Sequence, residues 1–238
     1  MPAEATIRAG TQSRKGVTLI TAIVGVGNLG SAVARHLVAG DELVVLAAQD
    51  EAHAVDLAHE LGPRAEAALV EDAIEAADVV VLALWLDQIR ELVPEQARLL
   101  EHEIVVDPSN PIGFDQTGQM IRTLPDDQSS GSIVARLLPA STHYVKALGT
   151  LGADSLASSA NREPQRVALF YATDDDIAAG TVERLIRAAG FDPIKAGGAA
   201  AAIRMEGPNG DLSQGGLNGA LLDLDQARAA LATTEVPA

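Results

Sequence analysis

The feature that most constrains this chain is Gly25-Val26-Gly27-Asn28-Leu29-Gly30, a G-x-G-x-x-G motif. It follows an apolar run at 18–24 and opens a segment whose apolar residues recur with helical spacing. In a strand–turn–helix unit the first glycine permits the tight turn, the second admits a pyrophosphate, and the third packs helix on strand. Free N–H groups at the helix N-terminus would face the phosphates. The motif predicts a dinucleotide-binding turn, and a glycine-rich turn that binds nothing is the alternative.

Strand-like and helical segments alternate around this motif. Apolar runs at 42–47, 78–84 and 103–106 are separated by helical patterns at 52–61 and 87–100. The run DVVVLAL at 78–84 is apolar on both faces, which is typical of a parallel strand covered by helices. The alternation predicts an α/β fold with a Rossmann-type doubly wound parallel sheet.

Weaker patterns extend along the rest of the chain. We expect a short strand at 67–70, a loop at 110–130, strands at 143–148, 166–172 and 191–196, and helices at 133–138, 174–189, 199–205 and 217–231. They suggest three parts: a mobile N-terminal extension at 1–16, a dinucleotide-binding domain at 17–145, and a small C-terminal α/β domain for the acceptor at 146–238.

Charge and composition exclude several classes of function. The 17 basic and 33 acidic residues give a net charge of −16, which disfavours nucleic acids and anionic membranes as partners. The absence of cysteine excludes disulfides, thiolate metal sites and a cysteine nucleophile. Because the chain has no apolar leader region and no apolar run of about 18 residues, we expect a cytoplasmic protein.

The end of the second predicted strand should lie beside the adenosine ribose. It reads Ala47-Ala48-Gln49-Asp50, and Asp50 follows Gly30 at the spacing of about twenty residues at which an acid bonds the ribose of NAD. No Arg or Lys lies between Arg35 and Arg64 to hold a 2′-phosphate. Asp50 thus favours NAD, although an N-cap for the following helix explains it equally well.

Other candidate residues follow predicted strands, where the ligand crevice of an open sheet lies. Trp85 would shield a nicotinamide or ribose face, or else anchor packing, and Asn110 would bond a carboxamide or ribose, or else form a turn. These candidates are Leu84, Trp85, Asn110, Pro111, Gly149 and Thr150, with Met205 as a further lining residue.

Acid–base candidates are scarce, so no catalytic residue is assigned. Only His143 among the five histidines begins a strand in the second half, and a surface role suits it better. None of the three lysines lies on a helix that could project into a cleft. No metal-binding, nucleophile-elbow or phosphate-loop motif occurs.

The segments GVGNLG, DVVVLAL, VVDPSNP, YVKALGTLGA and AAGFDPIKAG together resemble one family. They are similar to the NADPH-dependent reductases of the deazaflavin coenzyme factor 420 and to their bacterial relatives, over about residues 18–205. The resemblance implies a Rossmann domain, a small C-terminal domain, and hydride exchange between NADPH and a flat ring held between them.

The chain departs from this family pattern in three places, one of which is Lys195, where the family usually carries an acid. Ala47 and Ala48 replace the Ser or Thr plus Arg that hold the 2′-phosphate of NADP, so NADP is the expected cofactor with NAD as the alternative. Gly149 replaces a larger polar residue, which predicts a widened pocket. A flavin, imine or carbonyl acceptor, a non-catalytic redox sensor, and a homodimer all remain open alternatives.

Overall fold

The computed structural model describes residues 19–233, so the predicted mobile extension at 1–16 lies outside the described residues. The strands are β1 (Ile20–Val24), β2 (Leu43–Ala47), β3 (Ala65–Ala67), β4 (Val79–Leu82), β5 (Ile104–Asp107), β6 (Ile112–Phe114), β7 (Met120–Arg122), β8 (His143–Ala147), β9 (Ala168–Ala172) and β10 (Asp192–Gly197). The helices are α1 (Asn28–Ala39), α2 (Glu51–Leu61), α3 (Val70–Ala76), α4 (Leu86–Glu95), α5 (Ser130–Leu137), α6 (Ala153–Ser159), α7 (Asp176–Ala188), α8 (Ala202–Met205) and α9 (Leu224–Ala232).

Eight of these strands form one sheet in the order β10-β9-β8-β5-β4-β1-β2-β3. The strands from β3 to β8 in that order run parallel, β9 pairs antiparallel with β8, and β10 runs parallel to β9. The predicted Rossmann-type sheet is confirmed. Since β1, β4, β5 and β8 are parallel, their carboxyl ends meet at one edge, where ligands of such sheets bind.

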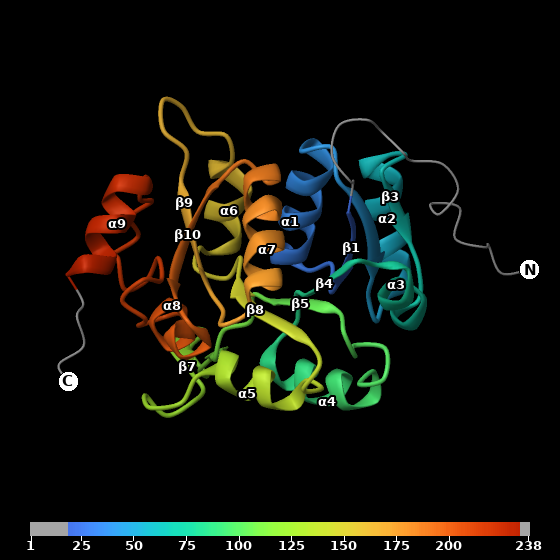
Figure 1. Ribbon diagram of the computed structural model, residues 1–238, viewed down its shortest axis with the longest axis horizontal. Coiled ribbons are helices and arrows are strands. Elements are labelled where there is room, and N and C mark those ends of the chain that lie inside the picture. Colours follow the sequence, from blue (N-terminus) through green and yellow to red (C-terminus); the bar gives the residue numbers. More distant parts are fainter. Residues whose placement is uncertain (1–18, 234–238) are drawn as a thin grey trace, which may run out of the picture.

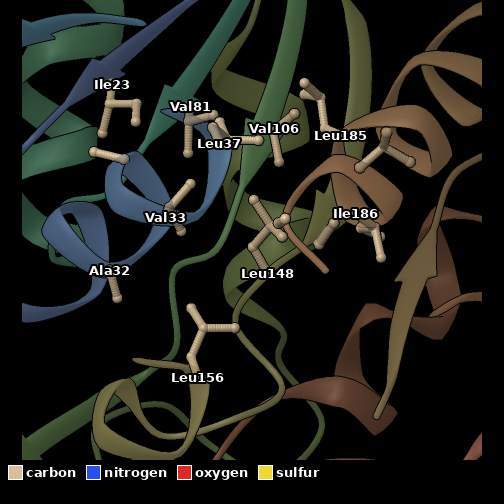
Figure 2. Close-up of a cluster of buried hydrophobic side chains, with 14 of the residues drawn as sticks. Ile23, Ala32, Val33, Leu37, Val81, Val106, Leu148, Leu156, Leu185 and Ile186 are labelled. Carbon is tan, nitrogen blue, oxygen red and sulfur yellow. The ribbon is translucent and has the colours of Figure 1, made fainter. Parts of the chain in front are cut away.

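Helices cover both faces of the sheet (Figure 1). Helices α1, α2, α6 and α7 pack on one face, and α3, α4 and α5 pack on the other. Figure 2 shows part of the first interface, where Ile23, Val81 and Val106 of the sheet meet Val33 and Leu37 of α1. Aliphatic side chains on both faces of the central strands explain their unbroken apolar runs.

A third apolar cluster lies under β9 and β10. It joins Phe170 and Ile194 to Met205 of α8 and Ala227 of α9. Met205 is only 2% exposed. Its expected role as a lining residue is therefore wrong, because its side chain belongs to this cluster.

Four local predictions need correction. The strand expected at 67–70 ends at Ala67, and Val70 begins α3, whose first turn carries the favourable Glu71 and Asp72. The loop expected at 110–130 contains the β6–β7 hairpin, and α6 was not expected. The helix expected at 217–231 begins only at Leu224, because Asp223 and Gln226 form a capping box there.

The predicted domain boundary between residues 145 and 146 lies inside β8. Strands β9 and β10, which follow it, continue the same sheet. The two parts therefore share one sheet, and their division into separate domains stays a prediction. Among residues 19–233, none of the helices is both long and apolar enough to cross a bilayer.

Candidate functional site

The glycine turn between β1 and α1 has three glycines in two kinds of environment. A Cβ on Gly25, whose φ is +100°, would lie 2.3 Å from the carbonyl oxygen of Ala83, and a Cβ on Gly30 would lie 1.9 Å from that of Gly25. A Cβ on Gly27 would meet nothing within 4 Å. The first and third glycines therefore serve close packing, whereas the second faces open space.

The N-terminus of α1 lies beside this open space. Gly27 is its N-cap, its first turn has no acidic residue, and no side chain among the described residues caps it. Val26 and Leu29 turn inward onto the core, while Gly27 and Asn28 are exposed. Uncapped N–H groups and the positive end of the helix dipole suit a pyrophosphate.

The end of β2 lies next to the glycine turn, since Gly25 N–H donates to Ala47 O at 2.8 Å. Asp50 is the N-cap of α2, because its side chain accepts a hydrogen bond from Ala52 N–H at 3.1 Å. The N-cap role is one of the two predicted for this residue. The Asp50 side chain is 62% exposed. Ala48 is half-buried and Gln49 is exposed. Oδ2 of Asp50 lies 3.8 Å from His53 Nε2.

The arginines that flank this segment in sequence have partners elsewhere. Arg35 forms an ion pair with Glu60 at 2.8 Å, and Arg64 forms one with Asp41 at 3.1 Å. Both arginines are therefore held by carboxylates.

Leu84 and Trp85 follow β4 at the same edge. The Leu84 side chain packs against the glycine turn, where a Cβ on Gly25 would lie 2.9 Å from it. Trp85 is 52% exposed and stands edge-to-face with Phe114 of β6, with ring centroids 6.5 Å apart. Trp85 is therefore not an anchor of the core, and about half of its surface is exposed next to Phe114.

Asn110, in the loop after β5, forms hydrogen bonds with the segment after β8 and with the segment after α8. Its Oδ1 accepts from Gly207 N–H at 2.8 Å, and its Nδ2 donates to Gly149 O at 2.9 Å. The neighbouring Pro111 is buried, and its carbonyl accepts from Thr123 N–H at 2.8 Å. Asn110 therefore positions the loop after β5, and its contact with a ligand stays a prediction.

Gly149 does not widen a pocket, so that expectation is wrong. A Cβ on Gly149 would lie 2.1 Å from the carbonyl oxygen of Pro108, because the loops after β5 and β8 touch there. The next residue, Thr150, is 4% exposed, and its Oγ1 has no hydrogen-bond partner among the described residues.

We expect Gly149→Ala to destabilise the protein. The added methyl would force the Pro108 backbone to move, and such overpacking costs about 1–3 kcal/mol. The matched control is Gly180→Ala in α7, where a Cβ meets nothing within 4 Å and alanine favours the helix. Urea unfolding of both variants measures the difference, and equal stabilities would contradict this packing.

A buried ionic cluster lies behind the same edge. Lys146 of β8 is 2% exposed, and its Nζ lies 3.1 Å from Asp107 Oδ2, 3.6 Å from Glu206 Oε1 and 3.0 Å from Ser130 Oγ. It also donates to the carbonyl of Ser109. Asp107 and Glu206 are both fully buried.

Glu206 also caps α5 from outside that helix. Its carboxylate accepts from Gly131 N–H at 2.8 Å, from Ser130 N–H at 3.1 Å and from Ser129 Oγ at 2.8 Å. Arg122 Nη2 of β7 lies 3.8 Å away. The segment after α8 is thus fixed to α5 and to the hairpin.

Tyr144 completes this cluster. Its hydroxyl donates to Asp107 Oδ2 at 2.9 Å. Burial, together with the negative charge of Asp107, raises the pKa of Tyr144 well above its usual value. Tyr144 therefore keeps its proton, and that proton is committed to Asp107.

Sequence reasoning missed this cluster. Its one available signal is Lys146 inside the apolar strand sequence HYVKAL, because a charge on a buried strand requires a partner. Glu206 carries no such signal in the sequence, because it directly precedes a Gly- and Pro-containing segment that predicts a loop between two helices.

His143 is part of a separate ion pair at the start of β8. Its Nδ1 lies 2.6 Å from Asp175 Oδ2, at the N-terminus of α7. Burial raises the pKa of Asp175, but hydrogen bonds from Ala178 N–H and His143 outweigh it and hold that pKa below its usual value. Among the described residues, no group of His, Asp or Glu could hold a metal ion.

Comparison with solved structures finds the same fold elsewhere. A hypothetical protein from Sinorhizobium meliloti, SMa0349, is 28% identical with a TM-score of 0.74, over 87% of this chain and 96% of its own. A protein of Arthrobacter sp. FB24 proposed to be an F420-dependent NADP reductase is 23% identical with a TM-score of 0.67, over 77% and 86%. The reductive aminase of Aspergillus terreus, solved with NADPH, is 19% identical with a TM-score of 0.56, over 77% and 56%.

Sequence comparison matches part of the chain to one family. No curated protein matches the chain. Residues 20–111 match the model of the family described as "NADP oxidoreductase coenzyme F420-dependent", which confirms the resemblance drawn from the motifs over that region. The matched region contains the glycine turn, β4 with Trp85, and the loop after β5 as far as Pro111. The chain is therefore an oxidoreductase, and its residues 20–111 are similar to the family of coenzyme F420-dependent NADP oxidoreductases.

Proposed function

We propose that this protein transfers a hydride between NADP(H) and a flat ring acceptor, such as a deazaflavin coenzyme. The observation that carries the proposal is the open space at Gly27 beside the uncapped N-terminus of α1. Of the three glycines only Gly27 faces open space, because a Cβ on Gly25 or Gly30 would meet neighbouring backbone atoms. The donor set and the space both fit a dinucleotide.

The remaining residues of the edge would hold the two halves of the dinucleotide. Ala48, Gln49 and Asp50 lie on the β2 side, where the adenosine ribose of a Rossmann protein binds. The nicotinamide half would lie beyond the carboxyl ends of β4, β5 and β8. The candidate residues on that side are Leu84, Trp85, Asn110, Pro111, Gly149 and Thr150.

A bound nicotinamide supplies the hydride chemistry, and the chain supplies its placement. Hydride transfer between two rings depends on distance and orientation, while protons are available from water. Lys146 and Tyr144 both donate hydrogen bonds to the buried carboxylate of Asp107, so neither is free to act as an acid. The structure therefore supports a reaction controlled by positioning.

Turnover distinguishes this proposal from its rivals. A reductase of a flavin, an imine or a carbonyl would oxidise NAD(P)H with one of those acceptors but not with the deazaflavin. A redox sensor would bind the dinucleotide and oxidise it with none of them. The small-molecule acceptor is common to all the enzyme alternatives, and a homodimer stays a prediction.

We expect NADPH to be bound in preference to NADH, with the 2′-phosphate held by backbone N–H groups and Gln49. Asp50 opposes that phosphate, so Asp50→Asn should raise the affinity for NADPH by about two- to fivefold. The affinity for NADH should fall, because its ribose hydroxyl would lose a carboxylate acceptor. Asparagine is also a good N-cap, so α2 should be preserved.

Calorimetric titration of both dinucleotides tests this preference. Asp225→Asn in α9 is the control, since it makes the same change in net charge on an exposed first turn. A tenfold preference of the unaltered protein for NADH would overturn the choice of NADP.

A further inference from the structure

The segment that surrounds the end of β2 is basic only through histidine. Residues 36–63 contain three histidines and neither arginine nor lysine. His36 is in the last turn of α1, where its Nε2 lies 2.9 Å from a carbonyl oxygen of α6, and His59 is in the last turn of α2. His53 is in the first turn of α2, three residues after Asp50. Of the three, His53 is therefore the one beside the residues proposed to hold the adenosine ribose.

Asp50 and His53 form an exposed pair. Oδ1 of the Asp50 carboxylate accepts from Ala52 N–H at 3.1 Å, and Oδ2 lies 3.8 Å from His53 Nε2. The Asp50 side chain is 62% exposed and the His53 side chain 73%, so a ligand can reach both. In Rossmann proteins an acid at this spacing bonds the ribose 2′-hydroxyl of NAD, and an arginine nearby accommodates the 2′-phosphate of NADP. This pair supplies the acid and, in place of arginine, a histidine.

The other charged side chains on the elements around His53 are acidic or paired. Helix α2 packs against α1, β2 and β3. Arg35 of α1 pairs with Glu60 of α2 at 2.8 Å. Apart from the histidines, the remaining charged side chains of these four elements are Glu51, Asp56 and Glu66. A 2′-phosphate at this position would thus meet negative charge, which a proton on His53 would offset.

We infer that His53 sets the choice between NADP and NAD, and that this choice depends on pH. Histidine is the side chain whose charge changes between about pH 5 and pH 8. The protonated imidazole pairs with the 2′-phosphate and offsets the charge of Asp50. When the imidazole is neutral, Asp50 repels the phosphate and accepts instead from the 2′-hydroxyl of NAD. The inference rests on the proposed function, because it specifies a residue of the proposed nucleotide site.

Binding of the 2′-phosphate and protonation of His53 must favour each other equally, because the coupling between two bound ligands is reciprocal. Lowering the pH therefore strengthens the binding of NADP⁺ relative to that of NAD⁺. Conversely, the binding of NADP⁺ near neutral pH draws protons from the solvent onto His53. NAD⁺ has no 2′-phosphate and draws none onto this residue.

Calorimetric titration of NADP⁺ and NAD⁺ without an acceptor measures both effects. The oxidised dinucleotides are used because the reduced ones decompose in acid. Titrations at about pH 6 and about pH 8 give the affinities. Titrations near neutral pH in two buffers of different ionisation enthalpy give the number of protons taken up. The 2′-phosphate itself titrates at about pH 6, but that contribution is common to all variants and cancels when they are compared.

Three variants make the test specific to His53. As the pH is lowered, the ratio of the NADP⁺ affinity to the NAD⁺ affinity should rise about three- to fivefold more in the unaltered protein than in His53→Gln. The unaltered protein should also take up more protons with NADP⁺. His53→Arg has a permanent charge, so it should prefer NADP⁺ at both pH values. His59→Gln removes an exposed histidine about 9 Å further along α2 and should behave as the unaltered protein does.

The same pH dependence and the same proton uptake in the unaltered protein and in His53→Gln would overturn the inference and leave the proposed function standing. Failure of both dinucleotides to bind would overturn the two together. If binding follows the expected pattern but no acceptor oxidises NADPH or NADH, the result supports the role of His53 and contradicts the proposed hydride transfer.

Discussion

Replacing Gly27 with valine is expected to abolish dinucleotide binding while leaving the fold intact. The valine side chain would occupy the space through which the pyrophosphate reaches the N–H groups of α1. Loss of two hydrogen bonds to a charged group, at about 1.5–3 kcal/mol each, predicts a loss of affinity of about a hundredfold or more. The φ of −67° at Gly27 is ordinary for valine, so stability should not fall.

Gly30→Ala provides the contrast for this prediction. A Cβ there would lie 1.9 Å from the carbonyl oxygen of Gly25, so the variant should lose stability as well as binding. Calorimetric titration and thermal unfolding of both variants separate the two effects. An unchanged affinity in Gly27→Val would remove the pyrophosphate from this turn and with it the proposed function.

The glycine turn could be predicted because each of its constraints is local. The strand, the three glycines and the apolar face of α1 are contiguous in the sequence, and their spacing alone determines the turn. The central strands could also be predicted from the sequence, because burial on both faces requires unbroken aliphatic runs such as that of β4. Short exposed strands leave no such pattern, which is why the β6–β7 hairpin read as a loop.

Contacts between distant segments could not be predicted. Whether Gly149 opens a pocket depends on Pro108, whose carbonyl lies against it only after β5 and β8 have paired. Glu206 reaches the N-terminus of α5 across more than seventy residues of sequence. Spacing within one segment carries no information about such partners. Hence the proposed binding residues, those of the glycine turn included, stay predictions.

The buried cluster supplies the largest expected effect on stability. Lys146→Met would fill most of the same volume but leave the carboxylates of Asp107 and Glu206 buried without their ammonium partner. Removing one partner of a buried ion pair costs about 3–5 kcal/mol. That is a large part of the roughly 5–15 kcal/mol that stabilises a typical domain.

Two further variants make this expectation specific to charge. Lys195→Met removes an exposed lysine from β10 and should change the free energy of unfolding by less than about 0.5 kcal/mol. Lys146→Met combined with Asp107→Asn removes one charge of each sign, so it should regain part of the loss, because one buried carboxylate no longer lacks a counter-charge. Urea unfolding of the single and double variants measures the coupling. A double variant as unstable as the sum of its single variants would mean that Lys146 acts through packing alone, and that the ion pair with Asp107 does not hold the loop after β5 in place.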